Sequence, residues 1–146
     1  MREALAEAEQ AASRGEIPVG AVIVRDGEII ARAGNTREQA HDPTGHAEIN
    51  VIRAACEALG NWRLTGCTLY VTLEPCPMCA GAILAARLER VVYGASDPDA
   101  GCLGSRIHLF DIGFANRPWV KRGVLEEECT GLLRSFFRER RQDSGF

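Results

Sequence analysis

The sequence lacks long apolar runs, internal repeats and low-complexity segments. No stretch reaches the roughly 18 apolar residues that a membrane-spanning helix requires, so we expect no membrane insertion. The first residues are rich in alanine and glutamate and lack the basic-then-apolar order of a secretory signal, which favours the cytoplasm. Because no linker rich in proline, glycine or serine divides the chain, we expect residues 1–146 to form a single domain.

The chain also lacks an excess of positive charge and a regular spacing of cysteines. Its formal net charge is −3, so any nucleic-acid site must be a local basic patch. Of its six cysteines only Cys76 and Cys79 are close together in the sequence, unlike the disulfide framework of a small secreted protein. We therefore expect reduced thiols.

What the sequence does have is an alternation of helical and strand patterns. Hydrophobic periodicity and turn signals predict helices at 2–13, 46–59, 75–86 and 125–141, and strands at 19–24, 28–33, 68–73, 91–93 and 119–123. Segments 34–45 and 94–105 are rich in turn-forming residues and are predicted to be loops. Helices that alternate with short strands favour an α/β fold with three layers, α/β/α, in which helices cover both faces of one sheet.

Three potential metal ligands stand at the starts of two predicted helices. Cys76 and Cys79 are three residues apart, so they share one helix face, and the helix dipole favours their thiolate forms. His46 opens the other helix and can point toward the same spot. One histidine and two cysteines are a ligand set that suits zinc.

A structural zinc site would need a fourth protein ligand. Cys67 precedes Cys76 by a whole strand, and Cys56 lies three turns along its helix from His46. His41, in the preceding loop, stays an alternative. We expect the fourth position to be open to water, which favours catalysis. Of the nearby carboxylates, Glu48 is placed to serve as the base, whereas Glu74 at a strand end is expected to be structural.

The pairing of His46-Ala47-Glu48 with Pro75-Cys76-Pro77-Met78-Cys79 matches the signature of zinc-dependent nucleobase deaminases. Beyond this signature the chain resembles the bacterial tRNA-specific adenosine deaminase family over nearly its whole length. The segments that carry the likeness are Ile17-Pro18-Val19-Gly20-Ala21-Val22, Asn35, His41-Asp42-Pro43-Thr44, Leu73-Glu74-Pro75-Cys76, Met78-Cys79-Ala80-Gly81-Ala82, Arg90-Val91-Val92, Gly94-Ala95, Asp97, Gly104-Ser105, Asn116, Leu132-Leu133, Phe136-Phe137 and Arg140-Arg141.

The resemblance implies a function and roles for particular residues. The function is hydrolytic conversion of adenosine to inosine at the wobble position of tRNA, with one zinc ion per chain and Glu48 moving protons. Asn35 is expected to bind the nucleoside and the backbone N–H of Ala47 the base, while Asp97 is expected to approach a ribose hydroxyl. The resemblance also implies a five-stranded mixed sheet and a homodimer that binds the anticodon loop of tRNA.

The last predicted helix carries the basic cluster that an RNA substrate would need. At 100° per residue, Arg134, Arg138 and Arg141 form one stripe, and the residues predicted to face the core are Leu132, Leu133, Phe136 and Phe137. One phenylalanine ring lining an RNA pocket is the alternative. Arg140 falls inside the apolar sector, where a merely solvated arginine is unexpected, so we expect it to contact substrate.

Two other functions fit the metal signature. A deaminase of a free purine base or nucleotide, such as guanine, would share the zinc site but would not need the basic helix. A non-enzymatic zinc module would have a closed metal site and would tolerate loss of Glu48.

Overall fold

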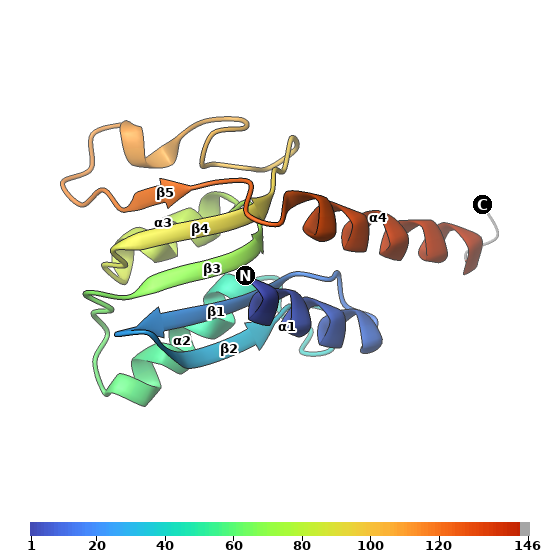
Figure 1. The fold of residues 1–146 in the computed structure, drawn as a ribbon, viewed down its shortest axis with the longest axis horizontal. Helices are drawn as coiled ribbons and strands as arrows, with labels where there is room; N and C mark the ends of the chain where they lie inside the picture. The colour runs from blue at the N-terminus through green and yellow to red at the C-terminus, as the bar shows by residue number, and fades with distance from the viewer. Residues whose placement is uncertain (144–146) are drawn as a thin grey trace.

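The computed structural model describes residues 1–143, and the last three residues of the expected domain, 144–146, lie outside the described part. Five strands form one sheet in the order β2-β1-β3-β4-β5 (Figure 1). The strands are β1 (Gly20–Arg25), β2 (Glu28–Gly34), β3 (Thr68–Leu73), β4 (Arg90–Ala95) and β5 (Trp119–Lys121). β1 is antiparallel to β2 and β3, whereas β3, β4 and β5 are parallel. The predicted five-stranded mixed sheet is confirmed.

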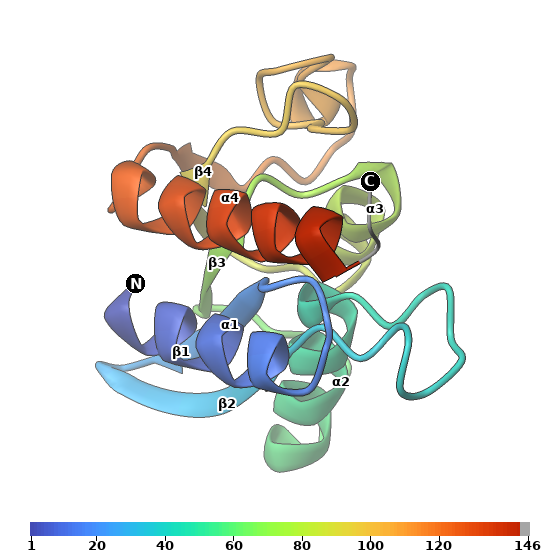
Figure 2. The same ribbon diagram turned by 90° about the vertical axis from the view of Figure 1, so that its right-hand side faces the viewer.

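Helices cover both faces of the sheet, which confirms the predicted three layers. α1 (Arg2–Ser13) and α4 (Glu126–Asp143) pack on one face, and α2 (Ala47–Leu59) and α3 (Pro77–Ala85) pack on the other (Figures 1 and 2). A short 3₁₀ helix, Leu109–Asp111, was not predicted. Within residues 1–143 no helix combines the length and hydropathy that crossing a bilayer requires.

Small residues let α1 lie directly on the central strands. Ala4, Ala8 and Ala11 are fully buried on one face of the helix. A Cβ atom at Gly20, the first residue of β1, would lie 2.1 Å from the carbonyl oxygen of Ala4. Glycine is therefore required there for this close approach.

The strand directions explain why distant segments meet at one edge of the sheet. β2 and β3 are both antiparallel to β1, so they run the same way, and β4 runs parallel to β3. The chain leaves all three strands at the same edge, where α2 and α3 begin and where residues 96–105 follow β4. Carboxyl ends of parallel strands are the usual place for a ligand site in α/β sheets.

The prediction that both phenylalanines of α4 face the core is wrong for Phe137. Phe136 is 8% exposed, but Phe137 is 44% exposed. Successive residues of a helix point about 100° apart, and the second half of α4 extends past the edge of the sheet (Figure 1). Phe137 therefore has no sheet to cover it, and its ring packs edge-on against Phe136, with centroids 5.6 Å apart.

Candidate active site

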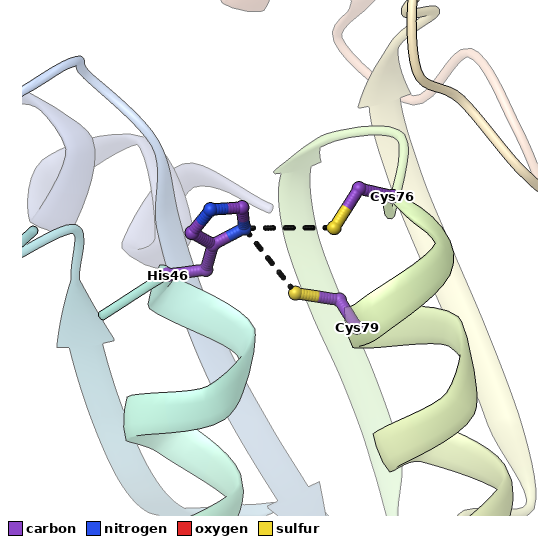
Figure 3. Close-up of side chains that lie close together, drawn as sticks. All are labelled: His46, Cys76 and Cys79. Atoms are coloured by element: carbon purple, nitrogen blue, oxygen red, sulfur yellow. Dashed lines mark hydrogen bonds between the residues drawn. The ribbon is translucent and has the colours of Figure 1, made fainter. Parts of the chain in front are cut away.

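The first turns of α2 and α3 present the three predicted metal ligands. His46 and Cys76 are the N-cap residues of these helices, both with extended backbone, and neither side chain caps its own helix. N-caps are normally Ser, Thr, Asp or Asn, whose oxygen accepts a backbone hydrogen bond. Here the two side chains point past the helix ends toward each other instead (Figure 3).

The distances within this triad fit a zinc ion. Nδ1 of His46 lies 3.6 Å from Sγ of Cys76 and 3.5 Å from Sγ of Cys79. Zinc–ligand bonds of about 2.0–2.3 Å in a tetrahedron place neighbouring nitrogen and sulfur ligands about 3.6 Å apart. Among residues 1–143 no fourth His, Cys, Asp or Glu joins this group, so Cys56, Cys67 and His41 stay outside it. These three side chains would hold a tetrahedral zinc ion with its fourth position open to a non-protein ligand.

Hydrogen bonding makes the two thiols of the triad unequal. The hydrogen bond from the thiol of Cys79, with help from His46, lowers the pKa of Cys76 to about 4. The same bond, together with burial, raises the pKa of Cys79 well above its ordinary value. The thiolate of Cys76, the form that binds a metal, is thus already favoured at the start of α3.

Glu48 is the second residue of α2 and lies next to the triad. Glu48 is only 4% exposed, and its carboxyl interacts with the thiol of Cys79. Burial raises the pKa of Glu48 to about 7. A carboxyl with a pKa near neutrality can both take up and release a proton.

A cavity of about 230 Å³ opens beside the triad. Three of the four residues predicted to contact substrate, Asn35, Ala47 and Asp97, line it. The full lining is Ile17, Val19, Asn35, Arg37, His46, Ala47, Glu48, Leu73, Glu74, Cys76, Asp97 and Ala100. Oδ1 of Asn35 is buried without a hydrogen-bond partner, which is rare in folded proteins and leaves it ready to accept one from a ligand. Ala47 is the first residue of α2, where backbone N–H groups have no partner within the helix.

Two loops, which we call the rim loops, contribute to the wall of the cavity: residues 36–45 through Arg37, and residues 97–105 through Asp97 and Ala100. Glu74 holds the second one. Its carboxylate accepts hydrogen bonds of 3.0 Å from the backbone N–H groups of Asp97, Leu103 and Ser105, and another from the Ser105 hydroxyl. Although burial opposes it, these bonds lower the pKa of Glu74. With both oxygens occupied, Glu74 is structural, as predicted.

The first rim loop contains a residue that the sequence did not reveal. Arg37 lines the cavity two residues after Asn35, and nothing in a turn-rich segment distinguishes it from a solvated arginine. Glu16, fully buried, accepts hydrogen bonds from the backbone of the same loop. In the sequence, the available signal was a glutamate between a predicted helix and a predicted strand. Its hydrogen-bond partners, Glu38 and Gln39, lie more than 20 residues away.

The structure places Arg140 outside the cavity. Its guanidinium donates a 2.5 Å hydrogen bond to the carbonyl oxygen of Gly15 and lies 4.8 Å from the ring centroid of Phe136. These contacts explain an arginine in the apolar sector of α4. They also join α4 to the segment that leads to Ile17 on the cavity wall.

Comparison with known proteins agrees with this geometry. The MafB19-like deaminase family model matches residues 1–141. The chain is 56% identical over 143 residues to a tRNA-specific adenosine deaminase of Bacillus subtilis, covering 97% of this chain and 89% of that protein. It is 52% identical over 144 residues to a tRNA-specific adenosine deaminase of Agrobacterium fabrum, covering 98% of this chain and 95% of that protein.

Solved structures give the same result. One, from a study of A-to-I editing by tRNA:A34 deaminases at the wobble position of transfer RNA, matches with a TM-score of 0.88 and 51% identity, covering 91% of this chain and 97% of that one. A guanine deaminase from Bacillus subtilis matches with a TM-score of 0.64 and 38% identity, covering 95% of this chain and 90% of that one. The chain therefore belongs to the MafB19-like deaminase family and, within it, to the tRNA-specific adenosine deaminases.

Proposed function

We propose that this chain hydrolyses adenosine to inosine and ammonia at the wobble position of tRNA, in the cytoplasm. The observation that carries the chemistry is a buried carboxyl, Glu48, beside a His-Cys-Cys triad at the bottom of a cavity. The tRNA substrate is supported by relatives that share half or more of their residues with this chain and carry that name.

His46, Cys76 and Cys79 would hold one zinc ion. A zinc ion at this position supplies a water activated for attack near neutral pH. Glu48 would take one proton from the attacking water and deliver it to N1 of the adenine ring as the oxygen bonds to C6. It would then take the proton of the new C6 hydroxyl and deliver it to the exocyclic amine, which leaves as ammonia, so the carboxylate is restored at the end.

The cavity walls would hold the target nucleoside. The buried Oδ1 of Asn35 needs a donor, and the backbone N–H of Ala47 can donate to the base. Oδ1 of Asp97 accepts hydrogen bonds from the backbone of Asp99 and Ala100, which leaves its other oxygen for a ribose hydroxyl. A base in a single-stranded anticodon loop can be splayed into such a cavity at little cost.

Two further surfaces would complete the RNA site. α4 extends past the sheet edge formed by the carboxyl ends of β2, β3 and β4 (Figure 1), and it carries the exposed Arg134, Arg138, Arg140 and Arg141. We propose that this helix contacts RNA phosphates. Exposed Phe114 lines a groove together with Leu84 and Ala85 of α3, and we propose that this apolar face joins two chains in a homodimer.

The deciding experiment offers one purified, zinc-loaded protein several substrates. An anticodon stem-loop with a wobble adenosine should be converted to inosine, as read by mass, while free adenosine, guanine and cytidine should react far more slowly. Preferred turnover of guanine would instead support the activity named for the 38%-identical structural neighbour. No turnover of any substrate, with zinc bound, would favour a non-enzymatic module.

The RNA surface is tested with Arg138→Gln/Arg141→Gln. Stem-loop binding should weaken, and its salt slope should shrink by up to about one unit per lost phosphate contact. Arg140→Gln is measured separately because Arg140 also joins α4 to Gly15. Unchanged binding and slope in the double variant would contradict RNA contact by this part of α4.

A further inference from the structure

Glu16 is a buried carboxylate that the proposed chemistry does not use. It lies between α1 and β1 and is fully buried. Its two oxygens accept hydrogen bonds of 3.0 Å from the backbone N–H of Glu38 and 2.7 Å from that of Gln39. A buried carboxylate is tolerated only when such bonds compensate for lost hydration. Glu16 thereby fixes the backbone directly after Arg37.

The backbone on the other side of Arg37 is fixed as well. The N–H of Thr36 donates to the carbonyl of Gly45 at 2.9 Å, and Nδ2 of Asn50 donates to the Thr36 hydroxyl at 2.9 Å. The carbonyl of Arg37 itself accepts a 3.0 Å bond from the N–H of Asp42. Arg37 thus stands on a rigid backbone at the cavity wall.

The side chain of Arg37 has no partner within the described residues. It is half-buried and lines the cavity together with His46. Within residues 1–143, no carboxylate pairs with its guanidinium and no acceptor takes a hydrogen bond from it. The carboxylates that share the cavity are Glu48, beside the triad, and Glu74 and Asp97.

An unpaired guanidinium carried by a fixed backbone at a substrate cavity is a site for an anion. A nucleoside carries no negative charge, so the only anion next to a target adenosine is a phosphate of its own chain. We propose that Arg37 binds a backbone phosphate adjacent to the target nucleoside and that Glu16 is the positioning residue that presents Arg37. This deepens the proposed function: it makes the first rim loop the part of the cavity that selects a nucleotide within a chain.

The test pairs a change in the protein with a change in the RNA. The substrates are the anticodon stem-loop and two copies in which one phosphate, 5′ or 3′ of the target, is an uncharged methylphosphonate. Arg37→Gln should lower kcat/KM on the normal stem-loop about 10- to 100-fold, mainly through KM. One of the two uncharged linkages should cause a similar loss in the native enzyme and little further loss in Arg37→Gln.

Controls separate this contact from general electrostatics. Arg25→Gln removes the same charge at the far end of β1, and it should leave kcat/KM unchanged. Arg37→Lys keeps the charge but not the paired donors, so it should recover part of the loss. If the uncharged linkage lowers kcat/KM by the same factor in Arg37→Gln as in the native enzyme, the two effects are independent, and the phosphate contact is overturned.

Glu16→Gln tests the positioning role. An amide can accept only one of the two backbone bonds, so the loop should loosen while the zinc content stays the same. The variant should reproduce part of the KM increase, and Glu16→Gln/Arg37→Gln should be no worse than Arg37→Gln alone. If the loss in the double variant is instead the product of the losses in the two single variants, Glu16 does not act through Arg37.

A last comparison identifies the source of the phosphate and separates this inference from the proposed function. If the linkage test assigns the contact to the 3′ phosphate, adenosine 5′-monophosphate and adenosine should be handled alike; if it assigns the contact to the 5′ phosphate, the monophosphate should be preferred in the native enzyme and not in Arg37→Gln. If the stem-loop is not deaminated but the monophosphate is preferred over adenosine, and Arg37→Gln abolishes that preference, the tRNA function fails and Arg37 is a monophosphate site. If the stem-loop fails and adenosine and its monophosphate are equal, the inference fails too.

Discussion

The bottom of the cavity and its rim are built by different means. The bottom consists of the first turns of α2 and α3, with His46, Glu48, Cys76 and Cys79, and needs only the strand directions to bring two helix starts together. The rim consists of two loops, each held by one buried glutamate that reaches across from elsewhere in the chain. This difference separates chemistry from recognition: the bottom should set the rate of reaction, and the rim should set which substrate reacts.

The largest effect is expected from removing the metal ligands. Cys76→Ala/Cys79→Ala should abolish zinc binding and activity, because two of the three protein ligands are lost. Elemental analysis after purification in metal-free buffer measures the zinc directly. Cys56→Ala, outside the triad, is the matched control and should keep one zinc per chain. Zinc retained in the double variant would show that the metal is held elsewhere.

The second largest effect concerns proton transfer. Glu48→Ala should keep zinc and fold but lose about 10⁴-fold or more in kcat, since each general acid–base step contributes about 10²–10⁴-fold. Glu57→Ala, an exposed glutamate on the same helix, should have normal kcat. Single-turnover rates on the stem-loop distinguish the two. Near-normal turnover in Glu48→Ala would require another base, and Glu74 is excluded by its hydrogen bonds.

A substitution at Gly101 in the second rim loop should lower the free energy of unfolding more than it changes the rate of reaction. A Cβ at Gly101 would lie 2.3 Å from Cδ of Glu74, so Gly101→Ala must displace the loop. Such overpacking costs about 1–3 kcal/mol in the free energy of unfolding, measured by denaturant titration. Gly131→Ala on α4, where a Cβ meets nothing within 4 Å, should instead stabilise by about 0.5–1 kcal/mol. Equal results for the two glycines would mean that the loop is not fixed by Glu74.

The smallest effect is expected at Asp97 in the second rim loop, and it tests whether the rim selects the substrate without affecting the metal site. Asp97→Asn should reduce the preference for a ribose over a deoxyribose target by about 10-fold, the value of one hydrogen bond to a charged group. Zinc content and unfolding should be unchanged. Initial rates on RNA and DNA forms of one hairpin give the ratio. If both rates fall equally, this part of the rim does not read the sugar.

The elements and the metal triad could be predicted because they rest on local signals. The predicted strand 68–73 has the observed bounds, and the predicted helix starts at residues 46 and 75 precede the observed starts by one and two residues. The roles of Glu16 and Arg37 could not be predicted, since they depend on contacts between residues more than 20 positions apart. Phe137 was misplaced because helical periodicity shows which residues share a face but not where the sheet beneath them ends.

The way Glu74 closes the second rim loop has a consequence for redesign. One carboxylate at the end of β3 ties together three positions of the loop, while Pro98 and Asp99 between them are exposed. The outer part of this loop can therefore be exchanged while its anchoring hydrogen bonds to Glu74 are kept. Its outer residues can be varied to explore other substrates, provided that Gly101, Ser105 and the anchoring glutamate are kept.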